Sequence, residues 1–358
     1  MRLRFARKGR QFFFFTFCVE GRAQMLSNLA AGPAVKGRGT KSPAPLDGGG
    51  NALAHAELLP PGEAVLRWLL ALHGENPALA VSNRVVMPDH VHFLLVVDFD
   101  RAPAFDPLAF AHRFRREAGR ETGGAGASPV PWERSFWLAL SLSARQLSAI
   151  RRYIRGNPAR ALWKKAHPDR FRVMSGIRHA SLDPAVAWSA MGDPTLLASP
   201  FRFPVRLTRK LPPEAQEPAL AAAVERARSG MVPVCGFISP AERELERRLR
   251  AEPSARWIKV VPHGLPANHD PSQEDSRALA EGRLVLLSPF SPEVPASPIS
   301  RANCETMNDR VFALCGEAAD PIRTGVTGVR HPGHAPDDFE RFPSANNTRE
   351  ITNERTMP

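Results

Sequence analysis

Tyrosine is almost absent from this sequence, which contains 20 Phe but a single Tyr, Tyr153. A chain that uses Phe wherever it needs an aromatic filler has little reason to keep one Tyr for packing, so we expect the Tyr153 hydroxyl to be needed. Asn157 follows four positions later, in the stretch Tyr-Ile-Arg-Gly-Asn-Pro. This spacing would place both side chains on one face of a helix.

Cysteine pairs and long apolar runs are also missing. The four Cys residues are scattered without a Cys-x-x-Cys motif, which argues against a zinc ribbon or a disulfide framework and fits a reducing cytoplasm. No segment approaches 18 uninterrupted apolar residues, so we predict no membrane-spanning helix. We therefore expect a cytoplasmic protein with no membrane partner.

Acidic residues are missing from one stretch, between Arg134 and Pro168. Residues 1–170 carry 25 Lys and Arg against 13 Asp and Glu, whereas residues 171–358 carry 23 of each. The whole net charge of +12 therefore lies in the first half. Because a solvated face usually mixes charges of both signs, we predict that this half binds a polyanion such as DNA.

The candidate DNA-binding residues belong to three predicted helices. The first helix covers residues 107–121, and the other two, 144–156 and 158–166, lie in the stretch without acidic residues. The cations assigned to DNA binding are Arg113, Arg115, Arg116, Arg120, Arg151, Arg152, Arg155, Arg160, Lys164 and Lys165.

Residues 90–98, His-Val-His-Phe-Leu-Leu-Val-Val-Asp, have the composition of a strand. Side chains alternate between the two faces of a strand, so His90 and His92 project from the same side. Two imidazoles are costly to bury in an apolar strand without partners, and a shared metal ion would satisfy both. The residues alone leave open a plainer interpretation, in which each His is a hydrogen-bonded core or edge residue.

Two motifs carry a resemblance to a known family. Met-Pro-Asp-His-Val-His ends at His92, and Tyr-Ile-Arg-Gly-Asn-Pro-Ala-Arg begins at Tyr153. In this order and spacing they resemble the HUH single-tyrosine transposases, in particular the REP-associated tyrosine transposases, whose hallmark reads Met-Pro-Asn-His-Val-His and then Tyr-Ile-x-x-Asn-Pro. The resemblance covers about residues 5–175. Asp89 stands at the usual Asn, and we expect a turn position there without consequence for the site.

The resemblance implies an enzyme that nicks single-stranded or hairpin DNA and transfers the strand through a covalent phosphotyrosine. Tyr153 would be the nucleophile, and His90, His92 and Asn157 would hold a divalent metal, Mg or Mn. Residue physics alone favours another role for Asn157. Asn followed by Pro is a common helix start, so we also expect a helix over 158–166 with Asn157 as its cap.

We predict an α+β fold with two domains. Residues 1–198 would form the HUH domain, for which the resemblance implies a ferredoxin-like sandwich with an antiparallel sheet, interrupted by a flexible insertion at 30–62. Residues 199–219 are rich in Pro and predict a linker. Residues 220–316 alternate strands with helices and predict a small parallel α/β domain. The tail, 317–358, is rich in Pro, Asn and Thr and predicts disorder.

The second domain carries a weaker resemblance of its own. Gly-Arg-Leu-Val-Leu-Leu-Ser-Pro from Gly282, and then Met307-Asn308, resemble the Rossmann-like domains of DNA-processing and lysine-decarboxylase-like proteins. An intact Gly-x-Gly-x-x-Gly is missing, so we assign no nucleotide there. Ser239-Pro-Ala-Glu242 is a capping box and predicts the start of a charged helix.

Three alternatives remain open. Relatives commonly carry an acidic residue where this chain has Leu138-Ala139. If that acid supports catalysis, this chain would be a weakened or domesticated DNA-hairpin-binding protein. A histidine-triad nucleotide hydrolase needs a third alternating His, but position 94 is Leu94. A nucleotide-binding role for the second domain is neither excluded nor supported by a motif.

Overall fold

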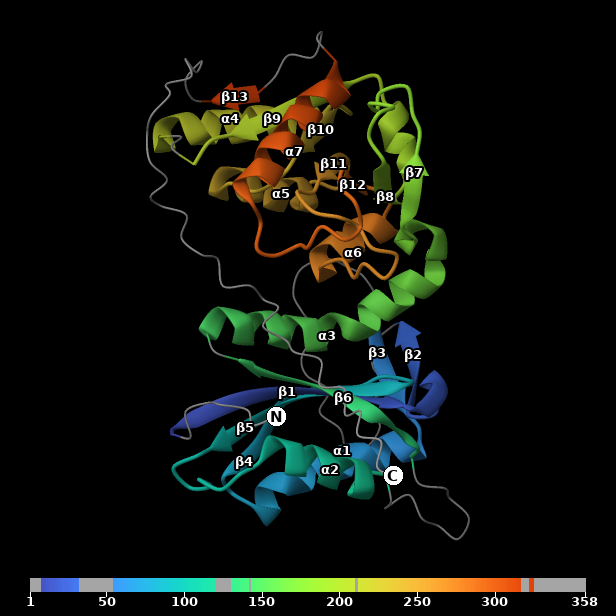
Figure 1. Cartoon of the computed structure of the whole chain (residues 1–358), viewed down its shortest axis with the longest axis vertical. Helices are drawn as coiled ribbons and strands as arrows, with labels where there is room; N and C mark the ends of the chain where they lie inside the picture. Colours follow the sequence, from blue (N-terminus) through green and yellow to red (C-terminus); the bar gives the residue numbers. More distant parts are fainter. Residues whose placement is uncertain are drawn as a thin grey trace. The chain divides into compact units, whose positions relative to one another are not determined.

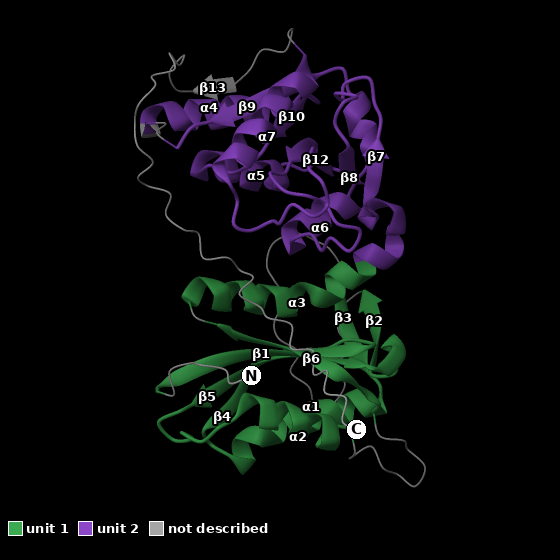
Figure 2. Ribbon diagram, in the orientation of Figure 1, with its two compact units in different colours: residues 1–162, 345–358 green, residues 163–344 purple. Residues whose placement is uncertain are grey.

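The computed structural model describes residues 8–31, 54–119, 130–141, 143–209, 212–316 and 322–324. The chain divides into two compact units, drawn in green and purple in Figure 2. The described part of the first unit ends at Leu162, and the second unit begins at Trp163. Both units combine helices with sheets, which confirms the predicted α+β class. No helix in the described ranges is long and apolar enough to cross a membrane.

A four-stranded antiparallel sheet is the centre of the first unit (Figure 1). Its strands, in spatial order, are β4 (Leu79–Val86), β5 (His90–Asp98), β1 (Arg10–Val19) and β6 (Trp132–Ser141). Helix α1 (Pro60–Glu75) precedes β4, and α2 (Pro107–Glu117) joins β5 to β6. The order β1-α1-β4-β5-α2-β6 with this strand arrangement is that of a ferredoxin-like sandwich.

A small hairpin lies between β1 and α1. After the short helix η1 (Glu20–Arg22), strand β2 (Ser27–Ala31) pairs with β3 (Ala54–Leu58) in an antiparallel, two-stranded sheet. The segment expected to be a flexible insertion, 30–62, thus begins and ends in regular structure. Its central part, residues 32–53, lies outside the described residues.

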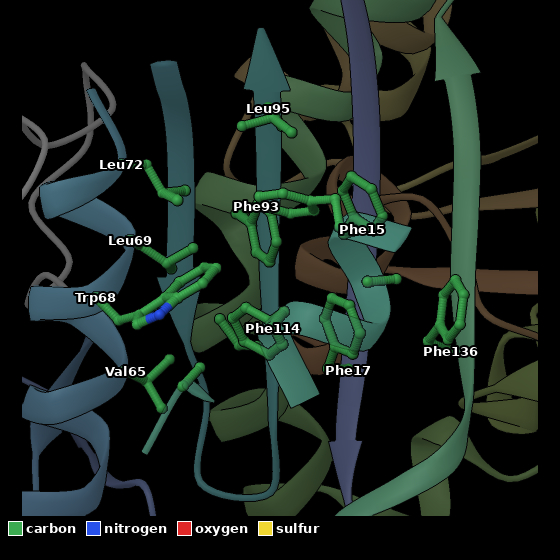
Figure 3. Packing of buried hydrophobic residues seen from close by; sticks show 14 of the residues in the cluster. Phe15, Phe17, Val65, Trp68, Leu69, Leu72, Phe93, Leu95, Phe114 and Phe136 are labelled. Atoms are coloured by element: carbon green, nitrogen blue, oxygen red, sulfur yellow. The ribbon is translucent and has the colours of Figure 1, made fainter. Parts of the chain in front are cut away.

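Aromatic rings fill the core between the sheet and helices α1 and α2 (Figure 3). Phe15 and Phe17 of β1 are fully buried there, and their rings stack on one another. Phe17 also stacks on Phe114 of α2, with ring centroids 4.1 Å apart. Trp68 of α1 contacts the same Phe114 ring edge-on at 5.3 Å. This burial of large apolar surface stabilises the central strands β1 and β5, which carry the candidate site on their other face.

Helix α3 (Ala144–Ala166) covers that other face. An apolar cluster joins helix and sheet and contains Phe14, Leu94, Ala139, Leu147, Ile150 and Ile154. Leu147, Ile150 and Ile154 form the apolar stripe that helical spacing predicts over residues 144–156. Because side chains alternate along β5, His90 and His92 project toward α3 together with Leu94.

Helix α3 runs without a break through Asn157-Pro158. The expectation of a second helix starting at Pro158 is therefore wrong, and Asn157 lies inside the helix, where it caps nothing. A Pro in a helix interior removes one backbone hydrogen bond and disfavours the helix. Here Ile154, Gly156 and Pro158 are all buried, so tertiary packing overrides the local preference of the Asn-Pro pair.

The second unit is built on a sheet with seven described strands. In spatial order they are β13 (Ile322–Thr324), β9 (Arg202–Leu207), β10 (Val232–Cys235), β11 (Trp257–Val260), β12 (Leu284–Ser288), β8 (Trp188–Gly192) and β7 (Met174–Ile177). The first five are parallel, whereas β8 and β7 add an antiparallel edge.

Helices cover both faces of this second sheet. One face packs on α4 (Pro213–Arg228), α5 (Pro240–Ala251) and α6 (Gln273–Ala280), and the other packs on α7 (Arg301–Cys315). Two short helices, η3 (Pro168–Phe171) and η4 (Pro194–Ala198), flank β7 and β8. The unit is a three-layer α/β sandwich, as the alternation of strands and helices indicated.

The boundaries of this second unit differ from the predicted ones. The predicted linker, 199–219, contains β9, a strand inside the sheet whose Phe203, Val205 and Leu207 are buried. Strands β7 and β8 belong to this sheet rather than to a first domain reaching residue 198, because β8 pairs with β12. Strand β13 lies in the predicted disordered tail, and the rest of that tail lies outside the described residues.

Candidate active site

His90 and His92 stand side by side beneath α3. Their ring centroids are 4.6 Å apart, with the ring planes at 71°. His92 is buried, with 5% of its surface exposed, and the His90 side chain is 16% exposed. The structure therefore brings the two predicted imidazoles together on one face.

Each imidazole has one ring nitrogen engaged by a neighbouring side chain. Asp89 Oδ1 lies 2.6 Å from His90 Nδ1, and Thr16 Oγ1 lies 2.7 Å from His92 Nδ1. A carboxylate only accepts hydrogen bonds, so His90 Nδ1 donates to Asp89. Partners at Nδ1 of this kind orient the ring and leave Nε2 for another ligand.

Burial determines the charge of His92. Desolvation, followed by the nearby charges of His90, Arg160 and Arg22, holds the pKa of His92 well below its usual value. His92 is therefore neutral at physiological pH. A neutral imidazole can bind a metal ion or accept a proton, whereas a protonated one cannot.

Tyr153 reaches this pair from α3. Its hydroxyl lies 3.5 Å from His92 Nε2, and the Tyr153 and His92 rings meet edge to face with centroids 5.2 Å apart. The Arg160 guanidinium lies over the Tyr153 ring, with its central carbon 4.4 Å from the ring centroid. The lone tyrosine and the predicted histidines thus meet in the structure.

Asn157 lies one helical turn after Tyr153 and is 6% exposed. Its Nδ2 atom is buried and has no hydrogen-bond partner among the described residues. Buried amides are normally hydrogen-bonded, so an orphaned amide next to the nucleophile candidate is unusual. In the described part of the chain, no three His, Cys, Asp or Glu side chains are arranged to hold a metal. A metal at the His pair would therefore need a ligand such as Asn157.

Sequence reasoning missed the groups that orient the histidines. Asp89 does occupy the bend before β5, as expected, but its carboxylate also binds the His90 ring and lies 3.4 Å from Arg22 Nη1. Burial is the largest single influence on the pKa of Asp89 and raises it, but the hydrogen bond from His90 and the attraction to His90 and Arg22 together leave the pKa below its usual value. A signal existed for Thr16, the single hydroxyl-bearing residue in the Phe-rich strand β1.

Arg22 reaches Asp89 from an unusual backbone position. It has a φ of +56°, in the left-handed region that residues other than Gly rarely adopt, and it directly follows Gly21 at +61°. Its Nε atom also lies 3.8 Å from the Glu133 carboxylate. Only the fold reveals this arrangement, because Arg22 and Asp89 are 67 positions apart.

The predicted DNA-binding cations of α2 lie away from the histidines. Helix α2 packs on the opposite face of the sheet from α3. Arg113 pairs with Glu75 and Glu117, and Arg116 pairs with Glu117. Arg115 is also on α2, and Arg120 lies outside the described residues.

The cations of α3 differ in their exposure. Arg152, Arg155 and Lys165 are exposed, Arg151 and Lys164 are half-buried, and Arg160 is buried at 6% exposure. Lys164 pairs with Asp270 at 2.7 Å. Among the described cations of α3, Arg160 is therefore buried beside Tyr153, whereas Arg152, Arg155 and Lys165 are accessible to solvent.

No protein-family profile matches the sequence, and no curated protein matches it significantly. Weak similarity exists to DNA processing protein A from Helicobacter pylori, described by its single-stranded DNA binding mode, at 19% identity and a TM-score of 0.33, covering 41% of this chain and 67% of that one. A REP-associated tyrosine transposase bound to a REP hairpin has 16% identity and a TM-score of 0.30, with coverages of 46% and 76%.

A third similar structure is DNA processing protein A from Streptococcus pneumoniae, at 15% identity and a TM-score of 0.32. That alignment covers 42% of this chain and 55% of the other, so this chain spans about half the length of the pneumococcal protein. Because all three TM-scores lie below 0.5, these similarities carry no argument about function.

Proposed function

We propose that the first unit nicks single-stranded or hairpin DNA and transfers the strand through a covalent link to Tyr153. The observation that carries the proposal is the 3.5 Å approach of the Tyr153 hydroxyl to His92 Nε2. It brings a nucleophilic hydroxyl to a pair of imidazoles whose other nitrogens are already engaged. Such a grouping of a nucleophile with oriented ring nitrogens is typical of covalent catalysis.

The donor set fits a divalent metal ion. His90 and His92 would supply their Nε2 atoms, and Asn157 would supply its amide oxygen once the orphaned amide group rotates. Imidazole nitrogens and an amide oxygen are common ligands of divalent ions. A cation held there would polarise the scissile phosphate. The resemblance, rather than the donor set, favours Mg or Mn.

The reaction balances without an added energy source. The Tyr153 Oη–P bond forms while the P–O3′ bond breaks; the phenol proton is lost, and the departing oxygen takes up a proton to give a free 3′ hydroxyl. The phosphotyrosine conserves the energy of the phosphodiester, so attack by another 3′ hydroxyl reverses the step and joins a new strand.

The exposed cations of α3 support DNA as the substrate. Arg152 and Arg155 are exposed on the helix that carries Tyr153, and the segment around them contains no acidic residue. Basic side chains in such a row contact phosphates and position the nucleic acid without reading its sequence.

The decisive test is the substitution Tyr153→Phe, which removes only a hydroxyl. We expect the variant to fold normally and to form no covalent adduct with labelled single-stranded or hairpin DNA, as measured by denaturing electrophoresis in the presence of Mg or Mn. His90→Ala and His92→Ala should each abolish both the metal dependence and the cleavage.

Adduct formation by Tyr153→Phe at the wild-type level would refute the nucleophile. Hairpin binding by the wild-type protein without any adduct would instead favour the alternative, a DNA-binding protein that has lost cleavage.

A further inference from the structure

The Tyr153 ring contacts three different side chains. Phe14 meets it edge-on with centroids 6.0 Å apart, His92 meets it edge-on at 5.2 Å, and the Arg160 guanidinium covers its face at 4.4 Å. Arg160 follows Tyr153 by seven positions, which is two helical turns and therefore the same face of α3. The helix itself thus brings the cation over the ring.

Arg160 differs from the other cations of α3 in its burial. It is 6% exposed, whereas Arg152 and Arg155 are exposed. A buried guanidinium is costly unless its surroundings compensate for the lost hydration. The face of an aromatic ring compensates in part, because the ring quadrupole attracts a cation and the planar guanidinium can stack on it. The positive charge also reaches His92, whose pKa it helps to lower.

This contact constrains the ring that carries the candidate nucleophile. With Arg160 over one face and Phe14 and His92 at its sides, the Tyr153 ring has little freedom to swing away. Its hydroxyl is consequently directed at His92 Nε2. A Lys at position 160 would keep the charge but would lose the planar stacking surface.

We propose that Arg160 is a positioning residue that holds the Tyr153 ring with its hydroxyl toward the histidine pair. Its charge alone would suggest a contact with the DNA backbone, but we assign it no such contact. The consequence for cleavage rests on the proposed function, whereas the contact with Tyr153 does not. Arg160 should therefore affect the rate of adduct formation, and Arg155 should affect DNA affinity.

The single tyrosine permits a direct test, because incorporation of 3-fluorotyrosine labels Tyr153 alone. In the full-length protein, we expect a ¹⁹F shift displaced from that of the urea-unfolded chain. Arg160→Met should move this shift toward the unfolded value, and Arg160→Lys should move it part of the way. Arg67→Met, on the exposed surface of α1, is the matched control and should leave the shift unchanged.

Kinetics on unlabelled protein supply the second measurement. At saturating single-stranded DNA, Arg160→Met and Arg160→Lys should slow adduct formation by roughly tenfold or more, as expected when a desolvated cation–π contact that aligns a reacting group is lost. Their Kd for DNA should stay within about twofold of the wild type. Arg155→Met should raise the Kd. Circular dichroism melts verify that each variant is folded.

The two hypotheses fail in different ways. An unchanged ¹⁹F shift in both folded Arg160 variants would overturn the positioning role, even if wild-type adduct is observed. A higher Kd with an unchanged saturated rate would also overturn it and make Arg160 a phosphate contact. A shifted ¹⁹F signal in a protein that forms no adduct would support the positioning role and refute the proposed cleavage.

Discussion

The environment of Asn157 differs from the one that its local sequence predicts. An Asn before a Pro is typical of a helix cap, yet here both residues lie within α3. The Asn157 amide is buried one turn from Tyr153, and its Nδ2 lacks a partner among the described residues. The cap role is excluded, and the proposed ligand role would give this buried polar side chain a partner.

Substitutions at Asn157 separate these roles. Asn157→Ser should abolish most metal-dependent adduct formation, because the shorter side chain cannot reach a cation shared with the histidines. Helix propensities of Asn and Ser are similar, so the Tm should fall by about 4 °C or less. Asn157→Asp restores an oxygen ligand with added charge and should show partial activity with a changed preference between Mg and Mn.

Adduct assays across a metal series, paired with calorimetric melts, measure both effects. Full adduct yield from Asn157→Ser would exclude the ligand role.

At the scale of elements, a group of four charges with two buried carboxylates joins strand β11 to helices α5 and α6. Lys259 Nζ lies 3.0 Å from Glu246 and 3.2 Å from Asp275, and Arg250 contacts both carboxylates at 2.7 Å. The Glu246 and Asp275 side chains are only 6% and 10% exposed. The cluster is neutral as a whole, so loss of one member leaves an unbalanced charge in the interior.

Lys259→Met should therefore destabilise the second unit strongly. Removal of one partner from a buried ion pair typically costs about 3–5 kcal/mol, because the remaining charge stays desolvated. Urea unfolding of the full chain, followed by circular dichroism, measures the loss. Arg247→Met, which removes a cation from a pair exposed on α5, is the matched control and should leave the midpoint almost unchanged. Equal midpoints for the two variants would contradict a structural role for the cluster.

The start of α5, in the same unit, is stabilised by a side-chain cap. The predicted capping box is confirmed, with Ser239 and Glu242 bonded reciprocally. The Glu242 carboxylate also accepts hydrogen bonds from the backbone N–H groups of Ile238 and Leu207. These donors are of the kind that bind phosphates at helix starts in nucleotide-binding folds. At this helix the chain's own carboxylate occupies them.

At the scale of the whole molecule, charge is the feature that distinguishes the two halves of the chain. The excess of Lys and Arg lies entirely within residues 1–170. Many of the cations in the second unit are paired, as Arg248 is with Glu217 and Glu244. We therefore expect polyanion binding to depend on the first unit, with α3 as its accessible basic element.

This difference predicts the salt dependence of DNA binding by the full chain. Each phosphate contact releases counterions, so Arg152→Gln and Arg155→Gln should each reduce the slope of log K against log salt by about 0.7 on single-stranded DNA. Arg301→Gln, at an exposed position on α7, is the control for the second unit. Fluorescence anisotropy titrations at several salt concentrations give the slopes. A reduced slope for Arg301→Gln alone would assign binding to the second unit.

The sequence alone determined the elements whose hydrophobic period is strong and local. It placed β5, the alternation that puts His90 and His92 on one face, and the apolar stripe of α3. The scarcity of tyrosine also made Tyr153 a candidate for a functional hydroxyl. These features depend on contacts between neighbours along the chain, so pattern and composition suffice to find them.

Only the tertiary structure decided the rest. An Asn-Pro pair looks the same in the sequence whether it starts a helix or lies inside one. Burial against the sheet therefore decides whether α3 breaks at Asn157. β9 contains Pro204 and lies between proline-rich stretches, and only its place in the second sheet makes it a strand. Thr16 meets His92 through the pairing of β1 with β5. Strand register joins residues distant in sequence, and no local pattern encodes it.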